Sequence, residues 1–297
     1  MNFHAERDAA TLAAKAQPAV ISGVDSTLVT NEKVLTERTR AAAAALRANG
    51  ILFSLISSRP PRGLRMLIAP LGITAPIVCF NGGIPVTANL AVLSAHLLPS
   101  GVARRMVDML DVRRVDVWIF SGQDWLVRHP DGPYVGLEER TVGFGPTIVD
   151  DFGPALDAAA KIVGVSADFE HLARCEGELR GALGEQASVV RSQPYYLDVT
   201  HPLANKGDAL IHLARLLKVP LAEVVAIGDG HNDIAMFERS GFSIAMGNAS
   251  PEVQRAADFV TGSNSEDGFA QAVEQLVLAV GRSSRQEVVA KGGDRVC

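Results

Sequence analysis

Short apolar runs alternate with helix-like segments at both ends of this chain, and this alternation constrains the fold more than any other feature. Five runs have the length and apolar content of strands buried in a parallel sheet: Val20–Ser22, Leu52–Ser57, Ile77–Phe80, Val224–Ile227 and Phe242–Ala245. Helical patterns separate them, and two of these, Thr36–Asn49 and Pro60–Leu71, stop immediately before a glycine. The alternation predicts a doubly wound α/β core whose functional groups gather at the carboxyl ends of the strands.

The middle of the chain, residues 84–194, does not show the same regular alternation of strand and helix patterns. Strand or helix patterns cover six segments: Val102–Leu110, Val115–Phe120, Trp125–His129, Lys161–Ser166, Phe169–Leu183 and Ser188–Ser192. This mixture predicts an inserted α+β cap domain, which leaves residues 18–83 and 195–281 to form a discontinuous core domain. Residues 1–17 are charged and Ala-rich, so we expect an N-terminal tail and not a signal peptide, and 282–297 are expected to form a disordered tail.

Composition and net charge limit the classes of binding partner that we expect. The 297 residues suffice for one large or two medium domains, and the net charge of −5 gives no electrostatic footprint for nucleic acid. No apolar run approaches membrane-spanning length, so neither nucleic acid nor a membrane is expected as a partner. Cys79, Cys175 and Cys297 are widely spaced, which predicts neither a disulfide framework nor a zinc site and fits a cytoplasmic location. The oligomeric state is left open.

The segment 227–233, which reads I-G-D-G-H-N-D, places two carboxylates and an amide at a predicted strand-to-helix turn. Such oxygen ligands favour a hard cation, Mg²⁺ in preference to zinc. Glycines at 228 and 230 are expected to permit tight or left-handed backbone there. The same letters also occur in solvated turns, so the interpretation depends on the rest of the chain.

Three further segments supply groups that a phosphate site beside Mg²⁺ requires. S-G-V-D-S-T-L at 22–28 follows the first predicted strand, and S-S-R at 57–59 follows the second, ahead of a helix opened by two prolines. N-K-G-D at 205–208 places a lysine at the start of another amphipathic run. An acid, a hydroxyl, a lysine and an acid pair are therefore expected at one edge of the sheet.

With these segments the chain resembles the haloacid dehalogenase (HAD) superfamily and, within it, the Cof-type sugar and small-molecule phosphatases. Four motifs and two softer matches carry the resemblance: Gly23–Leu28, Ser57–Arg59, Lys206–Gly207, Gly228–Asp233, Asn81–Gly83 and Ala245–Ala249. The resemblance spans about residues 18–280. It implies a HAD-like Rossmannoid core with an inserted cap that selects the substrate. It also implies Mg²⁺-dependent hydrolysis of a small phosphorylated metabolite such as a sugar phosphate.

The resemblance also implies roles for individual residues. The implied catalytic residues are Asp25 as general acid and base, Ser57 as a hydrogen-bond donor to phosphate, and Lys206 as a balancing charge. The implied metal ligands are Asp25, Asp229 and Asp233, with Asp233 holding either a metal-bound water or Lys206. The implied substrate contacts are Ser58, Arg59, Asn81, Gly82 and Asn232. Plainer roles stay open, such as a helix N-cap for Asp25, a turn for Ser57 and solvation for Lys206.

One position departs from the family pattern, because the nucleophilic aspartate of the family falls on Gly23. Glycine can neither attack phosphorus nor bind a metal through a side chain, so we predict impaired catalysis and a weakened metal site. Two alternatives remain: a non-catalytic, phosphometabolite-binding pseudophosphatase, or a shifted register with Asp25 as nucleophile. The ungapped match of D-S-T-L-V at 25–29 to the family's D-G-T-L-L argues against the shift. Ser26 stands where the family has glycine, and a positive φ there would add strain of about 1 kcal/mol.

Overall fold

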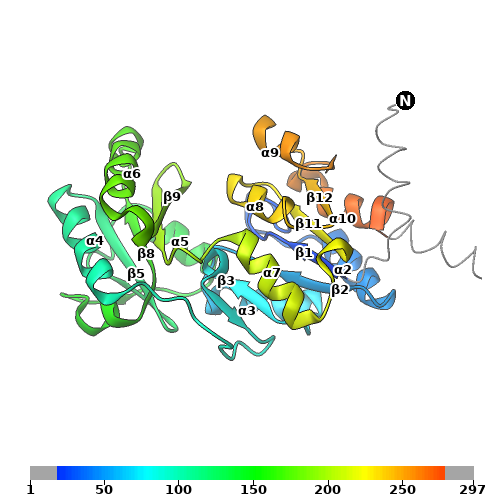
Figure 1. The fold of residues 1–297 in the computed structure, drawn as a ribbon, viewed down its shortest axis with the longest axis horizontal. Helices are drawn as coiled ribbons and strands as arrows, with labels where there is room; N and C mark the ends of the chain where they lie inside the picture. Colours follow the sequence, from blue (N-terminus) through cyan, green and yellow to red (C-terminus); the bar gives the residue numbers. More distant parts are fainter. Residues whose placement is uncertain (1–18, 278–297) are drawn as a thin grey trace, which may run out of the picture. The chain divides into compact units, whose positions relative to one another are not determined.

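A computed structural model describes residues 19–277, which divide into two compact units (Figure 1). Among these residues the first unit comprises 19–57, 67–77 and 206–277, and the second comprises 58–66 and 78–205. The tails predicted at 1–17 and 282–297 lie outside the described residues.

The first unit is built on a five-stranded parallel sheet with the order β13-β12-β11-β1-β2. Its strands are β1 (Ala19–Ser22), β2 (Leu52–Leu55), β11 (Val224–Gly228), β12 (Phe242–Ala245) and β13 (Phe259–Val260). β1 lies between β2 and β11, and all four of its residues are buried. The register sets Ser22 beside Ile227, so the carboxyl ends of β1 and β11 meet at one edge. The predicted α/β class with a parallel core sheet is confirmed.

Helices and short turns complete this unit. They are α2 (Glu37–Ala48), α7 (Lys206–Leu217), η4 (Leu221–Glu223), η5 (His231–Asp233), α8 (Ile234–Phe237), α9 (Pro251–Ala256), η6 (Asn264–Glu266), α10 (Gly268–Ala272) and η7 (Val273–Val277). Helix α3 (Pro61–Leu71) contributes residues to both units. The Thr36 side chain caps α2 by accepting from the Thr39 amide, and the helix buries Ala42, Ala43 and Leu46. The glycines that follow α2 and α3 have positive φ, as the sequence predicts for helix ends.

One predicted strand of the core sheet is wrong. The run Ile77–Phe80 is expected in the parallel sheet, whereas β3 (Ile77–Cys79) pairs with β4 (Ile84–Val86) in a separate two-stranded sheet. The turn η1 (Phe80–Gly82) separates the two strands, and Phe80, Asn81 and Gly82 all have positive φ. Three consecutive left-handed residues redirect the chain after only three strand residues, and the apolar pattern of the strand contains no signal of that turn.

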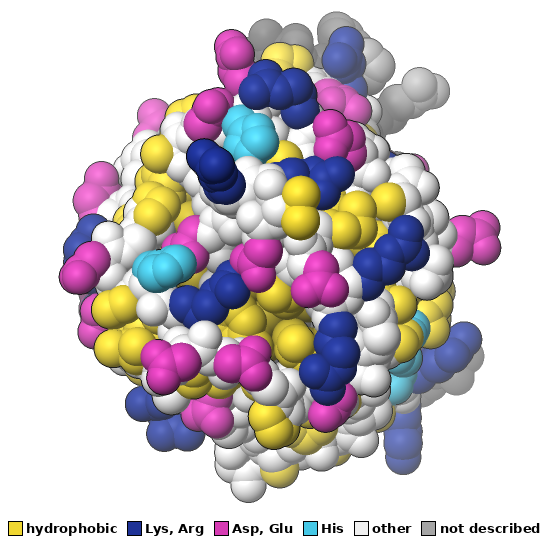
Figure 2. All heavy atoms as spheres, turned by 90° about the vertical axis from the view of Figure 1, so that its left-hand side faces the viewer, with side chains coloured by type: hydrophobic (Ala, Val, Ile, Leu, Met, Phe, Trp, Pro, Cys, Tyr) yellow, Lys and Arg dark blue, Asp and Glu magenta, His cyan; other side chains and the backbone are white. Residues whose placement is uncertain are grey.

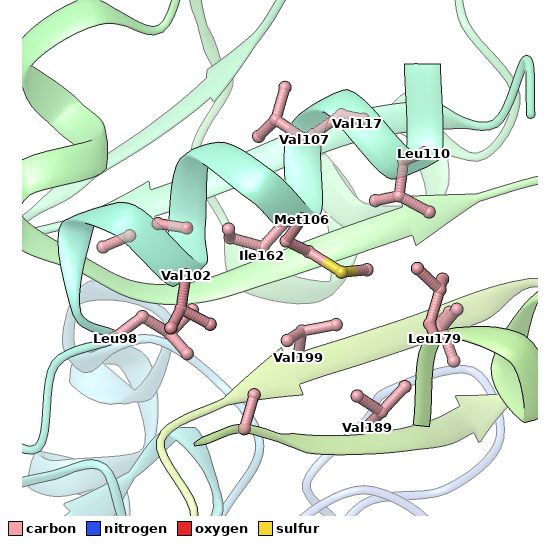
Figure 3. Packing of buried hydrophobic residues seen from close by; sticks show 14 of the residues in the cluster. Leu98, Val102, Met106, Val107, Leu110, Val117, Ile162, Leu179, Val189 and Val199 are labelled. Atoms are coloured by element: carbon pink, nitrogen blue, oxygen red, sulfur yellow. The ribbon is translucent and has the colours of Figure 1, made fainter. Parts of the chain in front are cut away.

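The second unit contains a six-stranded sheet with the order β7-β6-β5-β8-β10-β9. Its elements are α4 (Ser100–Val112), β5 (Asp116–Ser121), β6 (Asp124–Val127), α5 (Val135–Val142), β7 (Thr147–Ile148), η2 (Gly153–Ala158), β8 (Ala159–Val165), α6 (Phe169–Leu183), η3 (Gly184–Gln186), β9 (Ser188–Gln193) and β10 (Tyr196–Thr200). Figure 3 shows Met106 of α4 directed toward Ile162 and Val199 of the sheet, with Leu179 of α6 beside Val189. Trp118 and Trp125 are each 1% exposed, so both are core residues.

The end of the second unit differs from the boundary predicted at 194. Strand β10 pairs with β8 and β9, which makes residues 196–200 part of the second sheet, and this unit ends at Asn205. The predicted boundary therefore cuts between two paired strands. The role of this unit as a cap stays a prediction.

The surface on one side of the protein carries both acidic and basic side chains. The face at the left of Figure 1 shows acidic and basic side chains interspersed, with no gathering of one sign (Figure 2). Among residues 19–277, none of the helices combines the length and apolar character that crossing a membrane requires.

Candidate functional site at the carboxyl edge of the core sheet

The topology of the first unit brings the segment after β1 against the segment after β11. The Gly23 amide donates to the Ile227 carbonyl at 2.9 Å, which continues the pairing of the two strands. The Thr27 hydroxyl then donates to Asp229 Oδ1 at 2.7 Å across 202 positions of sequence. The charge of Asp25 contributes to a raised pKa at Asp229, so the two carboxylates share one electrostatic environment.

Lys206, at the start of α7, forms a buried ion pair with Asp233 at the end of η5. The Nζ to Oδ1 distance is 2.6 Å, and the two side chains are only 7% and 2% exposed. The other carboxylate oxygen of Asp233 accepts from the amides of Asp229 at 3.1 Å and Gly230 at 2.8 Å. Of the roles expected for Asp233, the one that the described contacts provide is the pairing with Lys206, and the same carboxylate fixes the loop.

Of the two reasons predicted for the glycines of this loop, left-handed backbone is wrong, and close packing is what the structure shows. Neither Gly228 nor Gly230 has a positive φ. A Cβ at Gly228 would instead lie 2.6 Å from Asp233 Oδ2, and one at Gly230 would lie 2.6 Å from Asn232 Oδ1. The glycines therefore allow the polar side chains of the loop to fold back against the backbone.

The Asp229 carboxyl is the strongly perturbed acid of this edge. Burial and the neighbouring charge of Asp233 raise its pKa to about 6, against the lowering effects of Thr27 and Lys206. Ionisation of Asp229 therefore lowers the stability of the protein when no ligand is bound. A bound cation would relieve that cost, and a perturbed carboxyl of this kind is typical of functional sites.

Asp25 projects from the turn after β1 and pairs with Lys33, whose Nζ lies 2.8 Å from Oδ1. Ser26 has φ of 56°, which confirms the positive φ considered from the sequence. The Asn248 amide group donates to the Ser26 carbonyl at 3.0 Å, and the Asn264 backbone amide donates to Asn248 Oδ1 at 2.8 Å. The segment Ala245–Ala249, which matches the family less strictly, therefore stabilises the turn that carries Asp25 through the Asn248 side chain.

Three residues of this edge were missed by sequence reasoning: Thr27, Lys33 and Asn264. Thr27 is part of the first motif, and its hydrogen bond to Asp229 follows once the two motifs are placed together. Lys33 follows Asp25 through turns and irregular backbone, so no helix or strand period applies to the pair. Asn264 donates to the Val29 carbonyl at 3.0 Å from a distant turn, and no local pattern indicates this contact.

Gly23 faces the centre of the site. A Cβ built on its backbone would lie 3.7 Å from Lys206 Nζ, 3.7 Å from Asp233 Oδ1 and 3.3 Å from Thr27 Oγ1. A side chain at this position would therefore enter the space bounded by the ion pair and the threonine. The backbone of Gly23 does not adopt a positive φ, so its conformation is open to other residues.

The remaining predicted residues divide between the two units. Ser57 is buried just after β2 in the first unit, where the Ile56 amide donates to the Ser22 carbonyl at 3.0 Å. Asn232 lies in η5 beside Asp233. The other substrate contacts fall in the second unit: Ser58, Arg59, Asn81 and Gly82. There the Phe80 amide donates to the Arg59 carbonyl at 3.1 Å, and the Arg59 side chain is buried.

The metal-binding capacity of the edge is limited by its donors. Within residues 19–277, no three or more His, Cys, Asp and Glu side chains converge in a way that could hold a metal ion. Asp229 is the carboxylate best placed for a cation, because Asp233 is engaged by Lys206 and Asp25 by Lys33. The position that would bring a further carboxylate toward Lys206 is Gly23.

Comparisons with known proteins agree with this arrangement. The model of the haloacid dehalogenase-like hydrolase family matches residues 20–273. A Haemophilus influenzae protein named "Putative phosphatase" is 30% identical over 258 residues, which cover 86% of this chain and 97% of that protein. A haloacid dehalogenase-like hydrolase from Bacteroides thetaiotaomicron, 29% identical, superposes with a TM-score of 0.79 over 86% of this chain and 98% of its own.

A HAD subclass IIB sugar phosphatase, 22% identical, shares the fold with a TM-score of 0.76 over 88% of this chain and 99% of its own. The chain therefore belongs to the haloacid dehalogenase-like hydrolase family, within its Cof-type phosphatases.

Proposed function

We propose that this protein is a Mg²⁺-dependent phosphatase of small phosphate esters, such as sugar phosphates, whose catalysis is impaired because Gly23 occupies the position of the nucleophile. The observation that carries the proposal is the direction of the Gly23 Cβ position, toward Lys206, Asp233 and Thr27. A carboxylate on that residue would stand beside the lysine that balances phosphoryl charge. Without it, the site keeps the binding groups and lacks the attacking oxygen.

The donors support a weakened Mg²⁺ site. Mg²⁺ commonly keeps several waters and binds through one or two carboxylates and the phosphate of a substrate. Asp229 offers one such carboxylate, and its pKa is raised by burial and by the charge of Asp233, a cost of ionisation that a cation would offset. We expect Asp229, the backbone carbonyl of Asp25 and the phosphate to hold the ion, which would withdraw charge from the phosphoryl oxygens.

The other residues of the edge have roles in binding and proton transfer. Asp25 would protonate the leaving oxygen of the ester and then accept a proton from water, and Lys33 would keep it oriented until substrate arrives. Lys206 and Ser57 would donate to phosphoryl oxygens. The sequence-derived substrate contacts stay part of the proposal: Ser58, Arg59, Asn81, Gly82 and Asn232. The second unit, as the cap, would select the small phosphorylated metabolite, and a cytoplasmic location fits such a substrate.

Two alternatives make different predictions. A pseudophosphatase that only binds its phosphometabolite is favoured by the absence of a side chain at Gly23, since removing one carboxylate also lowers the negative charge that opposes phosphate. A shifted register with Asp25 as nucleophile is disfavoured, because Asp25 is paired with Lys33 while the Gly23 position faces Lys206 and Asp233.

Hydrolysis of an aryl phosphate with Mg²⁺ tests the proposal. The native chain should turn over slowly, and Gly23→Asp, alone or with Ser26→Gly, should gain on the order of 10⁴–10⁶-fold, the effect of removing nucleophiles elsewhere. Gly23→Asn is the matched control, because it adds nearly the same volume without a nucleophilic carboxylate. Robust turnover by the native chain would instead support Asp25 as nucleophile, and a folded Gly23→Asp variant without gain would refute the alignment.

Substrate binding is measured separately from turnover. Titration calorimetry of the native chain with inorganic phosphate and a panel of sugar phosphates, in the presence of Mg²⁺, should show binding even where hydrolysis is absent. Binding by the native chain with no detectable hydrolysis would favour the pseudophosphatase. Absence of any phosphate binding would contradict both functions.

A further inference from the structure

The space beside the Gly23 Cα is bordered by an ammonium, a hydroxyl and a carboxylate. Lys206 Nζ and Asp233 Oδ1 each lie 3.7 Å from the position of a Cβ, which is ordinary van der Waals contact, and Thr27 Oγ1 lies at 3.3 Å. We propose that this space is a binding site for a small carboxylate, formate above all, which takes the place of the missing side chain and serves as an external nucleophile. The inference rests on the proposed function, because it uses the same phosphate site.

The donor that would hold the carboxylate is the Lys206 ammonium. An ammonium has three N–H donors, and the ion pair with Asp233 uses one of them. Lys206 is 6% exposed, so a charge-assisted hydrogen bond from it is poorly screened by solvent. The Thr27 hydroxyl lies on the same side of Gly23, although it donates to Asp229.

The surrounding charges set a limit on the affinity. Asp229 and Asp233 oppose a further anion, and a cation at Asp229 would lessen that repulsion. Formate has three non-hydrogen atoms, and the best small ligands gain so little per atom that its Kd should be about 1 mM or weaker. Acetate carries a methyl group that must also fit against the backbone of Gly23, so formate should bind better than acetate.

The chemistry of the bound carboxylate is balanced with Asp25 as the proton donor. A formate oxygen forms a bond to phosphorus while the bond from phosphorus to the ester oxygen breaks, and the leaving oxygen takes the proton of the Asp25 carboxylic acid. The products are the alcohol and formyl phosphate. Water then attacks formyl phosphate, gives its proton to the Asp25 carboxylate, and returns formate and inorganic phosphate.

The experiment compares the native chain with Gly23→Ala in 4-nitrophenyl phosphate hydrolysis, with Mg²⁺ present and ionic strength held constant by sodium chloride. The Ala methyl group occupies the Cβ position and supplies no carboxylate, and the φ of Gly23 permits it. Formate at molar concentration should raise native turnover by about 10-fold or more, with saturation, and acetate should act more weakly. Gly23→Ala should show no saturable rise.

Two further readouts separate this inference from the proposed function. Hydroxylamine should trap formyl phosphate as formohydroxamate in native reactions only. Independently of turnover, the ¹³C resonance of labelled formate should broaden saturably with the native chain and not with Gly23→Ala. An equal response of Gly23→Ala, or no broadening with the native chain, would overturn the formate site. If Gly23→Asp is active while formate neither binds nor rescues, the proposed function stands and this inference fails.

Discussion

Ser26 provides a direct test of the backbone geometry at the site. Its φ of 56° lies in the left-handed region, which residues other than Gly, Asn and Asp rarely adopt. The contact that fixes the turn, from the Asn248 side chain, is made to the Ser26 backbone carbonyl. Ser26→Gly therefore removes the steric cost of Cβ and retains this hydrogen bond.

The expected gain follows from two opposing effects. Left-handed backbone costs an L-residue about 1–2 kcal/mol, and glycine relieves that cost. Glycine also increases the entropy of the unfolded chain, which offsets about 0.4–1 kcal/mol of the relief. The free energy of unfolding should thus rise by about 0.5–1 kcal/mol, a small increase that urea denaturation of matched samples resolves as a higher midpoint.

A control substitution isolates the steric effect. Ser94 is exposed and does not have a positive φ, so Ser94→Gly has only the entropic penalty and should lower the free energy of unfolding. Opposite signs for the two substitutions, measured as urea midpoints at equal m-values, would support the strained turn. Equal losses in both variants would refute it, because they would mean that Ser26 occupies an ordinary conformation in solution.

Four other substitutions test the site and the second unit. Lys206→Met should lower the free energy of unfolding by about 3–5 kcal/mol because it leaves Asp233 buried and unpaired, whereas Lys33→Met, which breaks a half-exposed pair, should cost under about 1 kcal/mol. Asp168→Ala removes the acceptor for the His171 amide at the start of α6 and should cost about 1 kcal/mol in the same assay. The pKa of Asp229 is raised from 3.8 to about 6, so without metal the native chain should lose stability as pH rises between these values. Asp229→Asn should not show that loss in EDTA, should be more stable at pH 7 by on the order of 2 kcal/mol, and should no longer be stabilised by Mg²⁺.

Sequence patterns predicted the helices and strands that are determined by residues close together in the sequence. Helix α6 begins and ends at the predicted residues, because its apolar positions repeat with helical spacing between an Asp N-cap and a glycine. Strand β12 was predicted with the same accuracy from a short apolar run. The clustering of Gly23, Asp25 and Asp229 also followed from the sequence, since parallel strands present their carboxyl ends at one edge.

Long-range contacts account for what was missed. Strand β10 carries Asp198, whose carboxylate pairs with Lys161 of β8 at 2.8 Å in the interior of the second unit. A charged residue in the middle of a strand resembles a solvent-exposed position until its partner is known. The pairing of Asp25 with Lys33 and the position of β3 outside the core sheet likewise depend on contacts that no local period encodes.

The charged groups of the edge are retained for different physical reasons. Once Lys206 and Asp233 are both buried, removing either one leaves the other as an unpaired buried charge, so the pair is needed for stability. Its presence alone therefore does not indicate catalysis. Asp229 is different, because its ionised form is disfavoured by burial and by Asp233, and asparagine would be the more stable choice at neutral pH. A group that lowers stability where a neutral residue would serve is best explained by a ligand that needs its charge. Gly23 is the reverse case: its amide keeps the bond to Ile227 whichever side chain is present, so under the proposed function a missing nucleophile would lower activity and metal binding and would leave the fold intact.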